Sequence, residues 1–208
     1  MKNLNIKLQR CKRTDTNYQE IRNRHYVANR GTHGQQIHYL ILFEEEIVGI
    51  ISGASSVWAV KARDEYFGLN KQNKQAALPS IINNTVFRLE KHIPNLATFV
   101  LAIWRKQIAL DWEERYKVKV HGFETFVIET DYRKGTLYKA DNWEYLGETA
   151  GSTKSHVGLE NKSKRKATEK KMIYAKKIPK TKLSTYYEST WNKKKKPADT
   201  SACHRSTS

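Results

Sequence analysis

The 208-residue sequence predicts a mixed α/β fold of the α+β kind, formed by a single domain with a basic C-terminal extension. Two apolar runs separated by three glutamates predict a β-hairpin in the first quarter of the chain. Further along, a stretch of helical periodicity lies between two β-rich runs. That order predicts two parallel strands joined by a right-handed crossover. The hairpin and the crossover together predict a mixed sheet.

The N-terminal part supplies the hairpin. Residues 1–19 are polar and basic, and we expect them to form a basic arm or a first strand. Residues 20–36 end near two glycines and predict a short helix or a turn. The apolar runs 37–43 and 47–52 predict the two hairpin strands, with the glutamates between them as the connection.

The middle of the chain contains the crossover. Residues 57–60 are expected to continue the sheet, whereas 61–67 and 72–77 are polar and helical or irregular. Residues 81–89 are rich in β-branched side chains and predict a central strand.

The strongest helix follows Pro94, with Asn95 as its expected N-cap. Apolar residues recur at helical spacing to about Tyr116. A helix of about 20 residues extends about 30 Å, which is enough to cross one face of a sheet. The apolar positions are Leu96, Phe99, Val100, Ile103 and Trp104.

The segment after this helix is the most informative. Residues 120–128 predict a strand, which is followed by a connection that carries Tyr138, a short helix, and a further strand entered through Trp143. This succession resembles the end of the catalytic domain of GNAT-type acyltransferases. We therefore expect a GNAT-like catalytic domain over residues 20–151.

The remaining residues are expected to extend that domain. Residues 152–191 predict a basic, partly ordered extension, in which 172–175 and 183–191 form a further strand pair or an appended arm. Residues 192–208, a Lys/Ser-rich tail, are expected to be disordered.

The charge is concentrated at both ends of the chain. The net charge is +17, with +6 in residues 1–30, −1 in residues 31–151 and +12 in residues 152–208. A nearly neutral body with basic ends is typical of proteins that bind a polyanion. We expect double-stranded DNA as the partner, although the last sixteen residues are better explained as a solvated basic tail.

The cysteines and the apolar runs indicate the cellular compartment of the protein. Cys11 and Cys203 lie near opposite ends, which argues against a disulfide framework and favours a reducing cytosol. The N-terminus lacks the apolar core of a secretion signal. The apolar runs are too short to span a bilayer. We therefore expect a cytoplasmic protein, for which a dimer is plausible.

Four residues are candidates for catalysis. His25 and the adjacent Tyr26 lie in a polar segment bounded by glycines, and a histidine can accept a proton or bind a metal near neutral pH. Glu124 lies in an otherwise apolar strand, so it must be paired, bind a metal or face a cavity, unless it points to solvent. Tyr138 can give a proton to a leaving group, or pack in the core.

Basic residues near these positions are candidates for contacts with phosphates. They occur both before the hairpin and around the last helix. The set comprises Arg22, Arg24, Arg30, Lys134, Lys139 and Lys154.

The turn before the long helix bears on the cofactor. In GNAT enzymes this turn contains glycines, whose backbone amides bind the pyrophosphate of coenzyme A. Residues 90–98 contain no glycine, so the close backbone approach that glycine permits is missing. The sequence therefore argues against coenzyme A. Asn95 and Thr98 nevertheless lie at a helix N-terminus, which attracts anions, and are the candidates for cofactor binding.

Many short blocks along residues 20–190 resemble the Mom family of phage DNA-modification proteins, which have a GNAT-like fold. The blocks include residues 22–26, 34–39, 49–56, 60–64, 80–84, 94–96, 122–127 and 134–143. The resemblance implies conversion of the exocyclic amine of adenine in DNA to a carbamoylmethyl group, which protects phage DNA from host restriction. It also implies functional roles for His25, Tyr26 and Tyr138, with Glu124 or Glu129 as the carboxylate, in a phage-infected or prophage-carrying bacterial cytoplasm.

The implied product suggests a donor. Acetyl transfer would give an amide, whereas glycine supplies the two carbons and the nitrogen of a carbamoylmethyl group. We therefore expect an activated glycyl donor such as glycyl-tRNA, with tRNA as a second partner. Iron held by His25, Tyr26 and Glu129 is a further hypothesis, because such side chains can bind iron. A target base in duplex DNA must leave the stack to be reached.

Two other classes of function remain open. One is a GNAT-type N-acetyltransferase of a small amine or a protein. The other is a non-catalytic DNA-binding protein.

Overall fold

The computed structural model describes residues 5–27, 34–154, 165–167 and 169–178. Its first elements are β1 (Ile6–Cys11), α1 (Thr16–Asn23), β2 (Gln36–Phe43), β3 (Glu46–Ser55), α2 (Lys61–Phe67), α3 (Lys74–Ala77) and the 3-10 turn η1 (Leu78–Ser80). Then come β4 (Ile81–Leu89), α4 (Leu96–Tyr116), β5 (Gly122–Val127), α5 (Thr136–Ala140), β6 (Glu144–Glu148), β7 (Ser152–Lys154), β8 (Arg165–Ala167) and β9 (Met172–Lys177).

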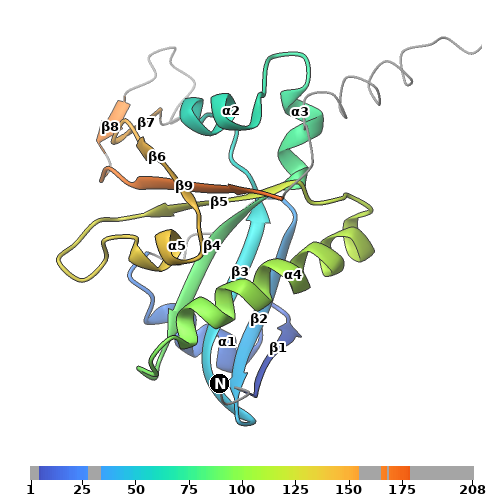
Figure 1. Cartoon of the computed structure of the whole chain (residues 1–208), viewed down its shortest axis with the longest axis vertical. Coiled ribbons are helices and arrows are strands. Elements are labelled where there is room, and N and C mark those ends of the chain that lie inside the picture. The colour runs from blue at the N-terminus through green and yellow to red at the C-terminus, as the bar shows by residue number, and fades with distance from the viewer. Residues whose placement is uncertain (1–4, 28–33, 155–164, 168, 179–208) are drawn as a thin grey trace, which may run out of the picture.

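A seven-stranded sheet organises the molecule, in the order β1-β2-β3-β4-β5-β9-β6 (Figure 1). Neighbouring strands in it are antiparallel except β4 and β5, which are parallel and are joined through α4. The short strands β7 and β8 pair separately. The hairpin and the parallel crossover occur as predicted, so the mixed α/β, GNAT-like fold class is confirmed.

The helices cover both faces of this sheet. On β2, Tyr39 and Ile41 pack in the core beneath α4, whereas Leu40 and Leu42 pack with α1 on the opposite face. This alternation follows the two-residue period of a strand. A Cβ atom on Gly53 would lie 2.4 Å from Ile108 of α4. The missing side chain therefore lets α4 approach the sheet closely.

Two local predictions need correction. Helix α1 begins at Thr16 rather than near residue 20, because Asp15 caps it by accepting a hydrogen bond from the Tyr18 N–H (3.0 Å). Strand β3 ends at Ser55, so residues 57–60 do not continue the sheet; Trp58 is exposed there.

Residues beyond 151 contribute to the main sheet. Strand β9 lies between β5 and β6, so the segment predicted at 172–175 is an internal strand of the sheet. The predictions for residues 183–191 and for the tail at 192–208 fall outside the described residues. None of the helices in the described part of the chain is long and apolar enough to cross a membrane.

Candidate active site

A wedge between β4 and β5 is the central feature of the site. The two strands pair in parallel from Ile81 opposite Gly122 to Asn84 opposite Thr125. Beyond this point β4 continues to Leu89 without β5 as its partner, and its pairing with β3 shifts by one residue at Thr85. Such a bulge bends a strand and increases its twist. The two strands therefore diverge.

Tyr138 of α5 places its phenol in this wedge. Its hydroxyl donates to Asn84 Oδ1 (2.9 Å), and the Thr125 hydroxyl lies 3.5 Å from the phenol oxygen. Thr125 also donates to the Asn84 carbonyl (3.0 Å). Burial strongly raises the pKa of Tyr138, so the phenol keeps its proton at neutral pH.

The ring of Tyr138 is fixed by two aromatic neighbours, one on β9 and one in the turn between α5 and β6. It stacks on Tyr174 of β9 at 5.7 Å between ring centroids and meets Trp143 edge-on at 5.1 Å. Trp143 in turn donates its indole N–H to Asp141 (2.7 Å). The phenol is thus held by the sheet and by α5 together.

On one side of α5 a hollow opens at the N-terminus of α4. Its volume is about 510 Å³. Its lining comes from the β4–α4 turn, the first turn of α4, and α5: Leu89, Glu90, Lys91, His92, Ile93, Pro94, Asn95, Ala97, Thr98, Thr136, Leu137 and Ala140. Both predicted cofactor-binding residues, Asn95 and Thr98, line it. The first N–H groups of any α-helix lack partners within the helix, so an anion bound in such a place is stabilised.

Asn95 shows how the turn forms without glycine. Its φ is +63°, in the left-handed region, and its side chain makes no capping hydrogen bond. The prediction that Asn95 caps α4 through its side chain is therefore wrong. Asparagine tolerates this conformation better than most residues, so it gives the turn the backbone geometry that glycine usually supplies.

His25 and Tyr26 lie just after α1, where their rings contact each other at 4.4 Å between centroids. The Val27 N–H donates to His25 Nδ1 (3.2 Å), which assigns the ring proton to Nε2. Burial, assisted by Arg22, lowers the pKa of His25 to about 4, so the ring is neutral at pH 7. His25 in this tautomer can donate a hydrogen bond from Nε2, but its other nitrogen is not free to accept a proton.

Tyr26 connects this corner with the wedge. Its phenol lies close enough to contribute to the raised pKa of Tyr138. The Arg133 guanidinium lies 3.7 Å from the centroid of the Tyr26 ring. The structure therefore brings three of the four predicted catalytic residues, His25, Tyr26 and Tyr138, into one region.

Glu124 is placed elsewhere. It is fully buried and its Oε2 accepts from Arg63 Nη1 (2.8 Å), which is equally buried. Burial raises the pKa of Glu124, and the nearby Arg63, Ser56 hydroxyl and Val57 N–H oppose this shift. The other carboxylate oxygen, Oε1, makes no hydrogen bond of normal length and angle. This carboxylate therefore forms a buried ion pair between β5 and α2, and its predicted catalytic role stays a prediction.

The predicted iron ligands come from two segments, the end of α1 and the loop after β5. Glu129 is exposed in the loop after β5, and its charge helps to raise the pKa of Tyr174, mainly raised by burial. His25 Nδ1 is occupied by the Val27 N–H. Among the described residues, three or more His, Cys, Asp or Glu side chains do not gather anywhere in a way that could hold a metal. Iron bound by His25, Tyr26 and Glu129 therefore stays a prediction.

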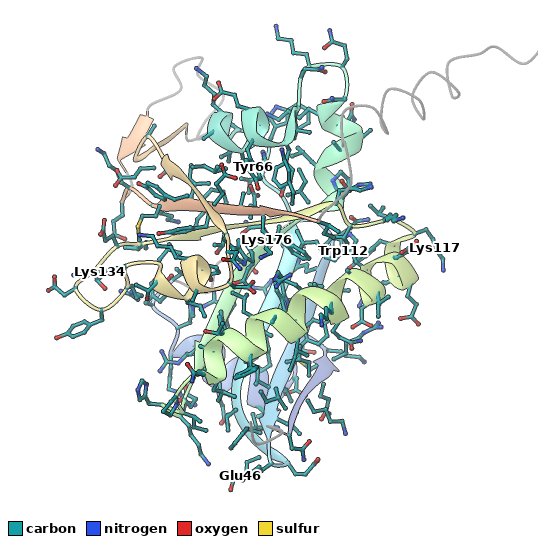
Figure 2. The ribbon with its side chains drawn as sticks, viewed as in Figure 1. Glu46, Tyr66, Trp112, Lys117, Lys134 and Lys176 are labelled. Carbon is teal, nitrogen blue, oxygen red and sulfur yellow. The ribbon has the colours of Figure 1, made fainter. Side chains whose placement is uncertain are left out.

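The candidates for phosphate contacts have different surroundings. Arg22 is buried and donates to the Val27 carbonyl (2.7 Å), so it holds the turn after α1. Arg24 pairs with Glu90 (3.1 Å). Lys134 and Lys139 are exposed around α5, and Figure 2 shows Lys134 on the projecting β5–α5 loop. Arg30 lies outside the described residues, as does the side chain of Lys154.

Sequence reasoning missed two residues of the site. Arg133 has no distinctive spacing, and its only signal is an aromatic-basic pair, Tyr132-Arg133, in the loop after a strand. Thr125 looks like any β-branched strand residue. Asn84, by contrast, could be suspected, because an amide within an apolar strand needs partners.

Solved structures with a similar arrangement are acetyltransferases. One is an acetyltransferase from Salmonella typhimurium that modifies the N-terminal serine of ribosomal protein L7/L12 (12% identity, TM-score 0.39, 70% of this chain and 65% of that one). Others are RimL with coenzyme A (12%, 0.39, 69% and 62%) and the microcin C7 self-immunity protein MccE with acetyl-CoA and AMP (13%, 0.39, 69% and 61%). The match spans less than two thirds of each of these three chains. No curated protein matches the sequence.

These structures correct the prediction about the donor. Two of them hold coenzyme A or acetyl-CoA, so the absence of glycine from residues 90–98 does not exclude this cofactor. The positive φ of Asn95 shows that this turn adopts a left-handed backbone conformation without glycine. The prediction of a glycyl donor, which went together with the argument against coenzyme A, is withdrawn as well.

The family resemblance also needs correction, and with it the adenine chemistry and the phage setting that it implied. Nothing found in the comparisons points to the Mom family. A different family model, described as Druantia protein DruA, matches residues 1–190, which is most of the chain. The chain therefore belongs to the DruA family.

Proposed function

We propose that this protein is an N-acyltransferase that moves an acyl group from a coenzyme A thioester to an amine. One observation carries the proposal: a protonated phenol, Tyr138, is fixed in the wedge where β4 and β5 diverge. The hollow at the start of α4 adjoins α5 on one side, and Tyr26 lies near the same phenol.

The hollow fits the phosphate end of coenzyme A. Asn95 and Thr98 line it together with the first turn of α4, whose N–H groups favour an anion. The stretch of β4 from Val86 to Leu89 has no β5 partner, so its edge is available to the amides of an extended arm. Coenzyme A supplies the acyl group in activated form, as a thioester.

Tyr138 suits the role of proton donor. In acyl transfer to an amine, the new C–N bond replaces the C–S bond, and the proton lost by nitrogen ends on sulfur. A phenol whose pKa is raised stays protonated and can give its proton to the leaving sulfur, while the proton lost by nitrogen returns to the phenol oxygen through solvent. Asn84 and Thr125 are positioning residues, because they orient the hydroxyl.

The chemistry of the site favours an amine that is already neutral. His25 has a pKa of about 4 and holds its proton on Nε2, so it is a poor base for an alkylammonium group such as that of lysine. An exocyclic amine of a nucleobase needs no such base before it attacks. The Nε2–H group of His25 can instead orient the acceptor by donating a hydrogen bond.

The test is acyl transfer by the purified full-length chain, with acetyl-CoA as donor and products identified by mass spectrometry. We expect Tyr138→Phe to lower kcat by about 10²-fold, since general acid catalysis typically contributes that much or more. Tyr174→Phe is the matched control, because it removes the hydroxyl of the ring stacked on Tyr138. Equal rates for both variants, or no turnover of acetyl-CoA by the wild type with any amine, would overturn the proposal.

A further inference from the structure

Three guanidinium groups, those of Arg24, Arg88 and Arg133, gather around the His25–Tyr26 ring pair. We call these five residues the arginine corner. Three chain segments meet there: the end of α1, strand β4, and the β5–α5 loop. Arg88 Nη1 donates to the Arg24 carbonyl (2.6 Å), which ties β4 to the end of α1. Arg133 contacts the Tyr26 ring.

Acidic side chains balance only part of this charge. Glu90 accepts from Arg88 Nε (2.5 Å) and also pairs with Arg24 (3.1 Å), so one carboxylate serves two guanidinium groups. Arg133 makes no ion pair with any described residue, although Glu129 and Asp131 precede it in the same loop, and its Nε is buried without a hydrogen-bond partner. Nη1 and Nη2 of Arg133 make no hydrogen bond or ion pair with a described residue either, and they are not among the buried unpaired atoms. They are therefore the donors that a ligand beside the partly exposed Tyr26 ring could use.

The unused donors fit an oxyanion. Guanidinium groups present several N–H donors in a planar fork that matches phosphate, which is why arginine is preferred for phosphate recognition. Arg88 and Arg133 both lower the pKa of His25, which shows that the local potential is positive. A bound phosphate would satisfy Arg133 and reduce the repulsion among these groups.

Exposed aromatic side chains next to Arg133 identify what carries the phosphate. Tyr132 is 97% exposed and Tyr26 is 42% exposed. Unpaired bases stack on exposed aromatic rings while the backbone phosphates contact basic groups, whereas the bases of a duplex are already stacked and paired. Rings and arginines side by side thus favour a single strand over a duplex.

We propose that the arginine corner binds single-stranded nucleic acid: Arg133 holds a backbone phosphate, and Tyr132 stacks on a neighbouring base. The inference deepens the proposed acyl transfer, because it names the acceptor as a nucleic acid whose base amines are unpaired. Binding itself requires no acyl donor, so the two proposals can fail separately.

The experiment measures the anisotropy of a fluorescent single-stranded oligonucleotide of mixed sequence, titrated with the full chain without acetyl-CoA. Arg133→Gln is expected to weaken binding about tenfold, the loss typical of a charged phosphate contact. The matched control is Arg115→Gln, since Arg115 also contacts a tyrosine, Tyr116 at 5.4 Å, and carries the same charge near the far end of α4. Tyr132→Ala tests stacking at a side chain too exposed to affect folding, and should weaken binding several-fold.

The outcomes separate the alternatives. Loss with Arg133→Gln and Tyr132→Ala, but not with Arg115→Gln, supports the proposal. Equal loss with both arginine variants, tighter binding of the matching duplex, or no binding by the wild type would each overturn it. If binding follows the proposal but no acyl group is transferred, the arginine corner stands and only the proposed catalysis fails.

Discussion

Arg63 and Arg133 occupy opposite kinds of environment, although both are arginines beside the strands of the wedge. Arg63 is fully buried, and its nitrogens reach Glu124 (2.8 Å), Asp64 (2.7 Å) and the Val57 carbonyl (2.7 Å). Arg133 has an aromatic ring beneath it and no carboxylate partner among the described residues. A charge that the fold satisfies internally is structural, whereas a charge left unsatisfied at a surface is available to a ligand.

The largest expected effect is on stability, at Arg63. Arg63→Met leaves Glu124 buried without its partner, and we expect the free energy of unfolding to fall by roughly 3–5 kcal/mol, the usual cost of breaking a buried pair. The double variant Arg63→Met/Glu124→Leu should recover most of the loss. Urea denaturation measures both. If the double variant is no more stable than the single one, the carboxylate is not the reason for the loss.

The next effect links folding to the site. Gly135 has φ +67°, and a Cβ atom there would lie 2.3 Å from the Tyr174 hydroxyl oxygen. Gly135→Ala should therefore destabilise the protein by about 1–3 kcal/mol and displace Tyr174, on which Tyr138 stacks. Thermal unfolding measures the loss. Gly147→Ala is the control for φ alone, because Gly147 has φ +100° and open space around it.

The sequence predicted the elements better than the contacts. The hairpin and the crossover follow from local periodicity, which each segment carries within itself. The sequence argument also foresaw that Glu124 needs a partner, but nothing in residue spacing points to Arg63, 61 positions earlier. The arginine corner is likewise assembled from three distant segments, so Arg133 had no local signal.

His25, a predicted catalytic residue, illustrates the same limit. A histidine beside a tyrosine in a polar, glycine-bounded segment suggested a base. Its role depends on which nitrogen is free, and a backbone N–H two residues later decides that. Burial, with arginines from α1, β4 and the β5–α5 loop, lowers the pKa of the ring. Local sequence patterns cannot show these contacts.

A smaller effect should appear as pH falls. Burial lowers the pKa of both His25 and His38 from 6.5 to about 4. Between these values the unfolded chain binds protons that the folded chain does not, so the stability present above pH 6.5 is lost progressively as pH falls toward 4. Urea denaturation at several pH values measures the slope. The variant His25→Gln/His38→Gln should have a flatter slope than the wild type over this range, and an unchanged slope would contradict the prediction.

The smallest effect on stability is expected at Arg133. Arg133→Gln removes a contact with the Tyr26 ring, which is worth about 0.5–1 kcal/mol at an exposed site, and leaves no buried charge behind. The free energy of unfolding should therefore change little, while affinity for single-stranded nucleic acid drops. Urea denaturation and anisotropy on the same preparation measure both. A stability loss as large as that of Arg63→Met would mean that the fold itself uses this guanidinium, and the contrast between the two arginines would disappear.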